Sequence, residues 1–224
     1  MEFDYSTAFS RNIGWVTTAE QKVLRGKRVA IAGLGGVGGS HLLTLARLGV
    51  GRFTLAEFDA FDLVNFNRQI GANMATLGRP KMDVMVEQAL AINPELDIRR
   101  FPEGLNADNV SDFLQDADLY VDGLDFFALD ARESIFAACA KLNVPATTVA
   151  PLGMGAALIN FLPGETTFEA YFGFAGRSEL ERALRFFIGI APARLQMAYL
   201  ADPSTINLAA GHGPSTIMGC MLCS

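Results

Sequence analysis

A glycine-rich run at residues 33–39 constrains this chain more than any other feature of its sequence. The run stands between an apolar segment, 29–32, and a stretch, 40–48, in which the spacing of leucine and alanine predicts a helix. Glycines at G-x-G-x-x-G spacing let the backbone turn tightly and let phosphate groups approach the N–H groups at a helix N-terminus. An ordinary packing turn is the alternative, but this context favours a bound nucleotide. The predicted contacts are Gly33, Gly35, Gly36 and Gly38.

An acidic residue follows the second apolar segment, as ribose binding requires. Glu57 ends the run 53–56, at the position where a carboxylate in this kind of fold accepts hydrogen bonds from both ribose hydroxyls. Asp59 is the alternative, because the period of two in a strand points both side chains to the same face. We favour Glu57 for the ribose and keep Asp59 among the predicted nucleotide contacts.

The composition is that of a globular protein without a membrane segment. The chain has 224 residues, half of them hydrophobic, which is enough to bury the core of one domain. Its formal net charge of −6 gives no basic field that would attract nucleic acid or an anionic membrane. The sequence has no long apolar run, no signal-peptide pattern and only three cysteines. We therefore expect a cytoplasmic protein without disulfides.

Cys220 and Cys223 have the spacing of half a zinc site. Structural zinc needs four ligands, and Cys139, His41 and His212 provide no second pair. The apolar residues around the two cysteines favour thiols buried along a helix instead. We predict no zinc site within this chain and interpret both histidines as ordinary polar residues.

Strand and helix signals alternate along most of the chain, which predicts an α/β fold with a doubly wound, Rossmann-like, mostly parallel sheet. After Pro151 the pattern changes to an antiparallel C-terminal extension, with strands at 156–162 and 167–174 paired around Pro163 and Gly164, then a helix at 178–188. The other expected strands are 28–33, 52–58, 97–101, 118–122 and 146–150, and the other expected helices are 40–48, 80–92, 106–114 and 126–142.

We expect a single domain with additions at both ends: an N-terminal arm at 1–25, a nucleotide-binding core at 26–162 and an extension of the same domain at 163–224. An apolar helical pattern reaches Ser224 without a C-cap signal. This pattern predicts that the chain is a fragment, or the first domain, of a longer protein.

The segment between the second strand and the next helix is rich in groups that bind phosphate. Lys81 lies in the first turn of a helix opened by Pro80, where a cation opposes the helix dipole unless an anion lies between them. Arg68 can add a planar, permanently charged fork to the same anion. A reaction that expels pyrophosphate needs such cations, whereas hydride transfer does not. Solvated surface side chains are the alternative interpretation for both residues.

These residues resemble the ThiF/MoeB/HesA-type adenylating enzymes, which are related to the adenylation domains of ubiquitin-activating enzymes. The resemblance implies an ATP-dependent adenylyltransferase that activates a carboxylate, such as the C-terminus of a ubiquitin-like sulfur-carrier protein or of a peptide, as an acyl-adenylate. It extends over residues 11–162, with weaker agreement as far as Ser224, and rests on the segments 33–38, 57–59, 65–69, 81, 91–94 and 122–125.

The resemblance also implies roles for single residues. The glycine turn and Glu57 would hold ATP, and Asp125 would bind Mg²⁺, although a plain loop acid is the alternative for Asp125. In relatives an arginine at the position of Arg11 reaches the ATP phosphates of the neighbouring subunit, which implies a homodimer with two composite sites. An exposed arginine on the N-terminal arm is the alternative there. The residues with implied phosphate contacts are Asn65, Arg68 and Lys81.

The sequence departs from the family pattern in three places. One is that the paired zinc motifs of many relatives are missing. Phe126 and Phe127 follow Asp125, where the family often has asparagine, and this changes the packing of the loop. No cysteine lies between Cys139 and Cys220, which argues against covalent transfer through this chain.

Three other functions stay open at this point. A dehydratase that activates a carboxylate on modified tRNA is disfavoured by the acidic charge balance. An NAD-dependent oxidoreductase is disfavoured by Arg68 and Lys81. A non-catalytic nucleotide-binding module fits less well, because the chain keeps all the polar and charged residues that the resemblance assigns to ATP and Mg²⁺.

Overall fold

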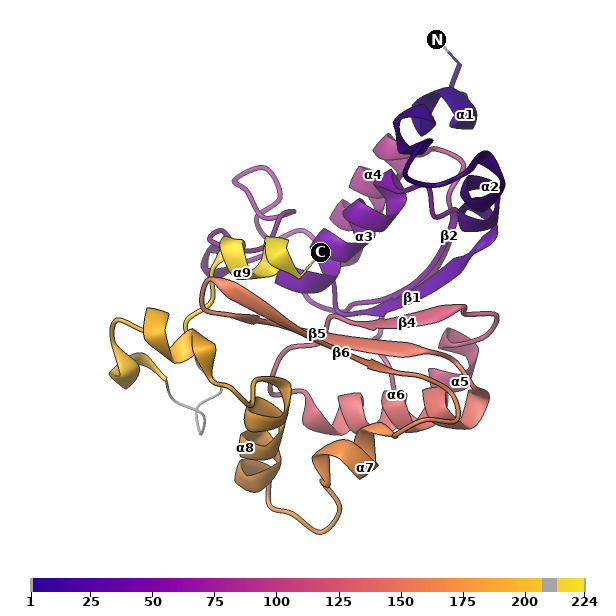
Figure 1. The fold of residues 1–224 in the computed structure, drawn as a ribbon. Coiled ribbons are helices and arrows are strands. Elements are labelled where there is room, and N and C mark those ends of the chain that lie inside the picture. Colours follow the sequence, from indigo (N-terminus) through magenta and orange to yellow (C-terminus); the bar gives the residue numbers. More distant parts are fainter. Residues whose placement is uncertain (1, 207–212, 224) are drawn as a thin grey trace.

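The computed structural model describes residues 2–206 and 213–223, which build a layered α/β structure (Figure 1). Within these residues the strands form one sheet in the order β3-β2-β1-β4-β5-β6. Neighbouring strands are parallel except β5 and β6, which are antiparallel. The predicted doubly wound sheet with an antiparallel C-terminal strand is therefore confirmed. The strands are β1 Arg28–Ala32, β2 Arg52–Ala56, β3 Asp97–Phe101, β4 Leu119–Asp122, β5 Ala146–Leu152 and β6 Gly155–Phe161.

Helices cover both faces of the sheet, and within the described residues no helix is long and apolar enough to cross a membrane. The α-helices are α1 Tyr5–Ala8, α2 Thr18–Gly26, α3 Gly36–Arg47, α4 Lys81–Ile92, α5 Val110–Phe113, α6 Leu129–Leu142, α7 Phe168–Phe172, α8 Glu179–Ile190 and α9 Ile217–Leu222. The short 3-10 helices are η1 Ser10–Asn12, η2 Leu63–Asn65, η3 Leu195–Tyr199 and η4 Pro203–Thr205.

The core has two parts, one on each face of the sheet. Val29 and Ile31 of β1 pack toward α3 and α4, whereas Ala30 and Ala32 pack toward the side of α5 to α8. Alternate residues of a strand point to opposite faces, and here both faces are covered, so the strand is apolar along its whole length. Figure 1 shows α3 and α4 above the sheet and α6, α7 and α8 below it.

The helix after the glycine run begins earlier than predicted. Position 40 was the expected start, but α3 begins at Gly36, so Gly38 and Gly39 lie within its first turns. Glycine costs helix stability in isolation, but these two glycines let the helix backbone lie against residues 33 and 34. Tertiary packing therefore overrides the low helix propensity of the motif.

The predicted strand at 167–174 is wrong. Residues 168–172 form α7, because Thr167 caps the helix by accepting a hydrogen bond from the Ala170 N–H, and Gly173 ends it with a φ of 64°. The antiparallel partner of β6 is β5, and the hairpin turn lies at Gly153 and Met154 instead of Pro163 and Gly164.

Two other predicted helices are shorter than expected. The helix at 106–114 is reduced to α5, because the Asn106 side chain accepts hydrogen bonds from the Asp108 and Asn109 N–H groups and forms a turn. The helix at 126–142 begins only at Leu129, which leaves residues 123–128 as a loop after β4.

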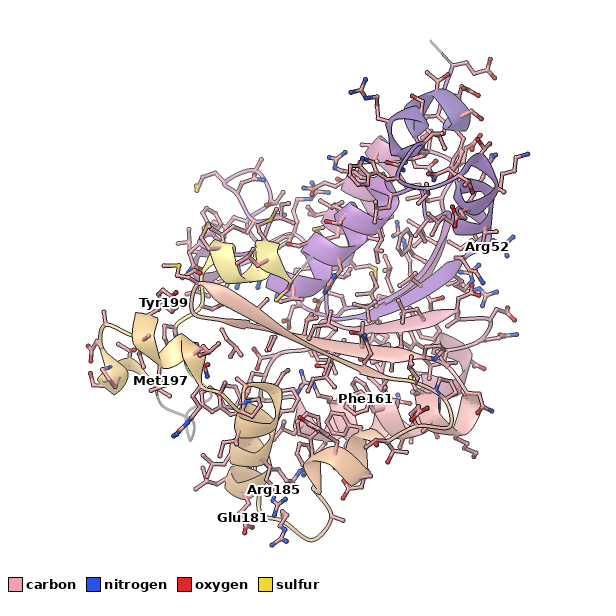
Figure 2. The ribbon with its side chains drawn as sticks, viewed as in Figure 1. Arg52, Phe161, Glu181, Arg185, Met197 and Tyr199 are labelled. Atoms are coloured by element: carbon pink, nitrogen blue, oxygen red, sulfur yellow. The ribbon has the colours of Figure 1, made fainter. Side chains whose placement is uncertain are left out.

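An aromatic cluster joins α6, α7 and α8 beneath the sheet. The Phe136 and Phe168 rings stack at 4.7 Å. Phe161, labelled in Figure 2, is at the end of β6, and its ring lies 5.3 Å from that of Phe136. Phe172 of α7 lies 5.1 Å from Phe186 of α8. The C-terminal extension is thereby packed into the same core as the nucleotide-binding sheet.

Candidate functional site

The glycine turn lies at the carboxyl end of β1, where it packs directly against the loop after β4. Gly33 has a φ of +83°, and a Cβ there would lie 2.3 Å from the Gly123 carbonyl oxygen. A Cβ on Gly38 would lie 1.8 Å from the Gly33 carbonyl oxygen. Both positions therefore require glycine for reasons of backbone contact. Gly123 was given no role from the sequence, because a single glycine after a strand does not indicate which distant segment it contacts.

The middle glycines of the motif form the start of α3. Gly35 is the N-cap, and no side chain in the described part of the chain caps the helix. The first N–H groups of a helix have no acceptor within the helix, so they can donate to a bound ligand. A Cβ on Gly35 would meet no atom closer than Gln69 Nε2 at 3.3 Å. The space beside Gly35 is therefore less crowded by protein atoms than the space beside Gly33 or Gly38. An anion could approach the start of α3 there.

Glu57 joins the glycine turn to the end of β2. The Glu57 side chain is buried, and its Oε2 accepts a hydrogen bond from the Leu34 N–H at 2.8 Å. Its Oε1 accepts from the Phe58 and Asp59 N–H groups, both at 2.9 Å. This carboxylate therefore fixes the turn relative to the segment that follows β2.

Lys81 lies at the first turn of α4, as predicted, but it is buried rather than solvated. Its side chain is 7% exposed, and Nζ lies 3.1 Å from Oδ2 of Asp59, whose side chain is 54% exposed. The Lys81 N–H also donates to the Asp59 carbonyl at 2.9 Å. A chain of contacts thus runs from the glycine turn through Glu57 and Asp59 to a buried ammonium group.

Asn65 of η2 and Arg68, three residues after it, take different positions. The Asn65 side chain is buried, and its Oδ1 accepts from the Asp62 N–H at 2.9 Å. Arg68 is partly exposed, and its Nη1 donates to the Val64 carbonyl at 2.8 Å and to Asn67 Oδ1 at 3.1 Å. Arg68 also borders the glycine turn, since its carbonyl oxygen would lie 3.5 Å from a Cβ on Gly36.

Asp125 lies in the loop between β4 and α6, on the same sheet edge as the glycine turn. Its side chain is exposed, and Oδ1 accepts from the Phe127 N–H at 3.0 Å. Phe126 packs inward, with its ring 5.3 Å from Phe186 of α8 and 6.4 Å from Phe187. Phe126, which stands where the family often has asparagine, therefore anchors the loop to α8.

A buried ion pair beneath this loop was not found by sequence reasoning. Arg132 Nε donates to Oδ2 of Asp122 at 2.6 Å, and both side chains are almost fully buried. Thr148 of β5 donates to the same oxygen at 2.7 Å. Arg132 looks like any helical arginine in the sequence, so no local pattern indicates this contact.

The C-terminal segment lies beside the glycine turn (Figure 1). A Cβ on Gly36 would lie 2.7 Å from Sγ of Cys220 on α9, and Asn67 Nδ2 donates to the Ser215 carbonyl at 2.8 Å. All three cysteines are buried, as predicted for Cys220 and Cys223, and burial raises the pKa of Cys139 and of Cys223 to about 12.

Arg11 lies away from the other predicted residues of its own chain. It belongs to η1, where the neighbouring Asn12 donates to the Leu48 carbonyl just after the end of α3. The glycine turn is at the opposite end of α3, about 18 Å away for a helix of this length. Within one chain the structure therefore does not bring Arg11 to the site.

One cavity lies apart from the candidate site. A cavity of about 640 Å³ lies between α1, α3 and α4, but its lining includes none of the predicted site residues. The described residues contain no group of three His, Cys, Asp or Glu side chains that could hold a metal ion. His41 is buried, and desolvation lowers its pKa to about 4. His212 lies outside the described residues.

The comparisons with known proteins agree with the predicted family. The family model described as "ThiF family" matches residues 9–222. Protein HesA, heterocyst, of Trichormus variabilis is 34% identical over 148 residues, which are 66% of this chain and 55% of that protein. The sulfur carrier protein ThiS adenylyltransferase of Escherichia coli is 34% identical over 143 residues, 64% of this chain and 56% of that protein. The chain thus spans about half the length of the curated relatives it matches.

Solved structures show the same fold. The E. coli tRNA N6-threonylcarbamoyladenosine dehydratase TcdA has a TM-score of 0.67 at 19% identity, covering 97% of this chain and 90% of that one. A complex of TcdA with ATP has a TM-score of 0.61, also at 19% identity, covering 88% of this chain and 96% of that one. The likeness extends through the C-terminal extension as well as the sheet.

Proposed function

The chain belongs to the ThiF family, and from that premise we propose that it uses ATP to activate a carboxylate group. In the proposed reaction a carboxylate oxygen attacks the α-phosphorus of ATP, the bond from that phosphorus to pyrophosphate breaks, and an acyl-adenylate forms. The observation that carries the proposal is the chain of contacts from the glycine turn through Glu57 and Asp59 to buried Lys81. The relative named an adenylyltransferase supports the same reaction.

We assign the phosphates of ATP to the N-terminus of α3 and to the cations beside it. Carboxylate attack on a phosphate brings two anions together, so the site needs fixed positive charge more than a strong base. Lys81 and Arg68 would supply that charge, and Asn65 would donate from its amide group. Lys81 needs little reorganisation, because its ammonium group is already held at the start of α4.

We assign the ribose to the carboxylates after β2. Glu57 already accepts three backbone hydrogen bonds, which leaves about one of its four lone-pair sites for a ribose hydroxyl. Asp59 is more exposed and carries the ion pair to Lys81. Glu57 would therefore shape the turn and contact one hydroxyl, while Asp59 stays available for the second.

Asp125 fits a magnesium site only together with ATP. It presents one exposed, hard oxygen donor on the sheet edge that carries the glycine turn, and the other ligands would be phosphate oxygens and water. Mg²⁺ bound there would neutralise charge on the phosphates. Asp125 itself would hold the metal–nucleotide pair in register with the glycine turn.

The proposed second substrate is the C-terminal carboxylate of a small ubiquitin-like sulfur carrier or of a peptide. The relative that acts on ThiS supports a sulfur carrier. A carboxylate borne by tRNA is the second candidate, because relatives include tRNA threonylcarbamoyladenosine dehydratases. The net charge of −6 disfavours a polyanionic substrate.

We also propose that the working form is a homodimer in which Arg11 reaches the site of the other subunit. The position of Arg11 near the far end of α3 supports action between chains over action within one. A guanidinium group supplied this way would contact phosphate oxygens much as an arginine finger does.

Calorimetric titration tests the nucleotide assignment. We expect ATP with Mg²⁺ to bind the wild-type protein and NAD to bind far more weakly, because the two cations match a triphosphate. Lys81→Ala should weaken ATP binding, whereas Lys22→Ala, an exposed lysine of α2, should not. Tighter binding of NAD than of ATP would refute the proposal.

A further inference from the structure

Arg132 of α6 is a buried charge that the proposed reaction does not use directly. Its side chain is 3% exposed, and its partner Asp122 at the end of β4 is 1% exposed. Oδ2 of Asp122 accepts from Arg132 Nε at 2.6 Å and from Thr148 at 2.7 Å, while Oδ1 accepts from the Leu124 N–H at 3.2 Å. The Asp122 carboxylate is thus bonded to the following loop, α6 and β5 at once.

The rest of the same guanidinium group holds the backbone of the loop that follows. Nη1 donates to the Phe126 carbonyl at 3.1 Å, and Nη2 donates to the carbonyls of Leu124 at 2.9 Å and Asp125 at 3.0 Å. The group lies 4.6 Å above the Phe186 ring of α8. The planar guanidinium group of arginine has enough N–H donors, in different directions, to bond one carboxylate and three carbonyls at once. A lysine ammonium group has only three donors on one nitrogen and cannot replace it.

This loop is also the surface against which the glycine turn packs. A Cβ on Gly123 would lie 2.5 Å from the Gly33 carbonyl oxygen and 2.8 Å from the Gly38 Cα. The Gly123 N–H donates to the Ala32 carbonyl at 2.9 Å. A shift of the loop would therefore move Asp125 relative to the start of α3.

We propose that Arg132, acting through Asp122, is a positioning residue that fixes the loop so that Asp125 and the glycine turn bind one metal–nucleotide pair in register. The inference rests on the proposed function, because it takes Asp125 and the turn as parts of one Mg²⁺–ATP site. An arginine with a purely structural role would stabilise the fold without changing how strongly Mg²⁺ promotes the binding of ATP.

The test is calorimetric titration of ATP, with and without Mg²⁺, into wild type, Arg132→Lys and Asp125→Ala. In wild type we expect Mg²⁺ to tighten ATP binding by about tenfold, a coupling of ordinary size between two ligands. Both variants should lose most of this gain, because Asp125 is absent in one and misplaced in the other. Binding of ATP without Mg²⁺ should be the same in all three proteins.

Arg182→Lys is the matched control. Arg182 of α8 forms ion pairs with Asp130 and Glu133 of α6 instead of with the loop, so its lysine variant should keep the full gain. An Arg132→Lys protein that keeps the gain would overturn the inference, and so would loss of the gain in both lysine variants. If Arg132→Lys does not fold, Arg132→Gln decides, because a single amide group cannot donate to Asp122 and to the three loop carbonyls together; an unchanged gain there overturns the inference.

The same titrations separate failure of the proposed function from failure of the role of Arg132. A wild-type protein that binds no ATP would refute the nucleotide assignment itself. A wild-type protein that binds ATP without any gain from Mg²⁺, or an Asp125→Ala protein that keeps the gain, would refute the metal role of Asp125 and the inference with it.

Discussion

At the scale of single residues, His41 shows how burial decides the chemistry of a side chain. It lies inside α3, and its Nε2 has no hydrogen-bond partner within the described part of the chain. Desolvation lowers its pKa to about 4, although the charge of Asp122 acts in the opposite direction. The imidazole is therefore neutral near pH 7.

This pKa shift predicts a pH dependence of stability. The unfolded chain binds a proton near pH 6.5 and the folded chain only near pH 4, so stability is full above pH 6.5 and falls as the pH drops toward 4. The loss should reach roughly 3 kcal/mol for this residue. Urea unfolding of wild type and His41→Gln at pH 7 and pH 4.5 measures it: the variant should lose less stability between the two pH values. Equal losses in both proteins would contradict the account.

The sequence predicted where the candidate site residues lie in the fold better than it predicted how their side chains are held. The positions of the glycine turn, Glu57 and Lys81 follow from local spacing. The burial of Lys81 and the backbone bonds of Glu57 depend on segments far apart in the sequence. The pairing of Arg132 with Asp122 depends on how α6 packs under β4, which no local pattern records.

At the scale of elements, α7 shows why a short apolar segment was assigned the wrong structure. The segment 167–174 contains aromatic residues that are compatible with either a strand or a helix. Phe168 and Phe172 are four residues apart, so a helix turns both side chains toward the aromatic cluster, where their rings lie 4.6 Å apart. Longer elements with regular spacing, such as the helix at 80–92, were predicted within one residue.

The packing of α7 leads to a prediction about stability. Phe168 is 3% exposed and stacks on Phe136 of α6. Phe168→Ala should lower the free energy of unfolding by about 3–5 kcal/mol, because it leaves a cavity inside the cluster. Leu180→Ala, at an exposed position of α8, should change it by less than about 0.5 kcal/mol. Equal effects of the two substitutions in urea unfolding would show that the cluster does not support the extension.

At the scale of the whole molecule, we propose that two chains share each site. Mixing Arg11→Ala with Lys81→Ala tests this directly, because each variant alone should be nearly inactive in ATP–pyrophosphate exchange. At equal concentrations with free exchange of subunits, half of the dimers are mixed and each has one complete site of two. Activity should therefore recover to about a quarter of wild type, if the two sites act independently.

Two results would contradict the shared site. One is full activity of Arg11→Ala alone, which would leave that residue outside the reaction. The other is no recovery after mixing, when exchange of subunits has been demonstrated by labelled chains.

The central claim of the account is that this chain makes an acyl-adenylate from a carboxylate and ATP. The most direct measurement is exchange of labelled pyrophosphate into ATP with a ubiquitin-like sulfur carrier that ends either in a free carboxylate or in an amide. We predict exchange only with the free carboxylate and with Mg²⁺, and a loss of about 10²- to 10³-fold in Lys81→Ala, in which a charge that stabilises the transition state is missing. Equal exchange with the amide, or unchanged exchange in Lys81→Ala, would contradict the claim.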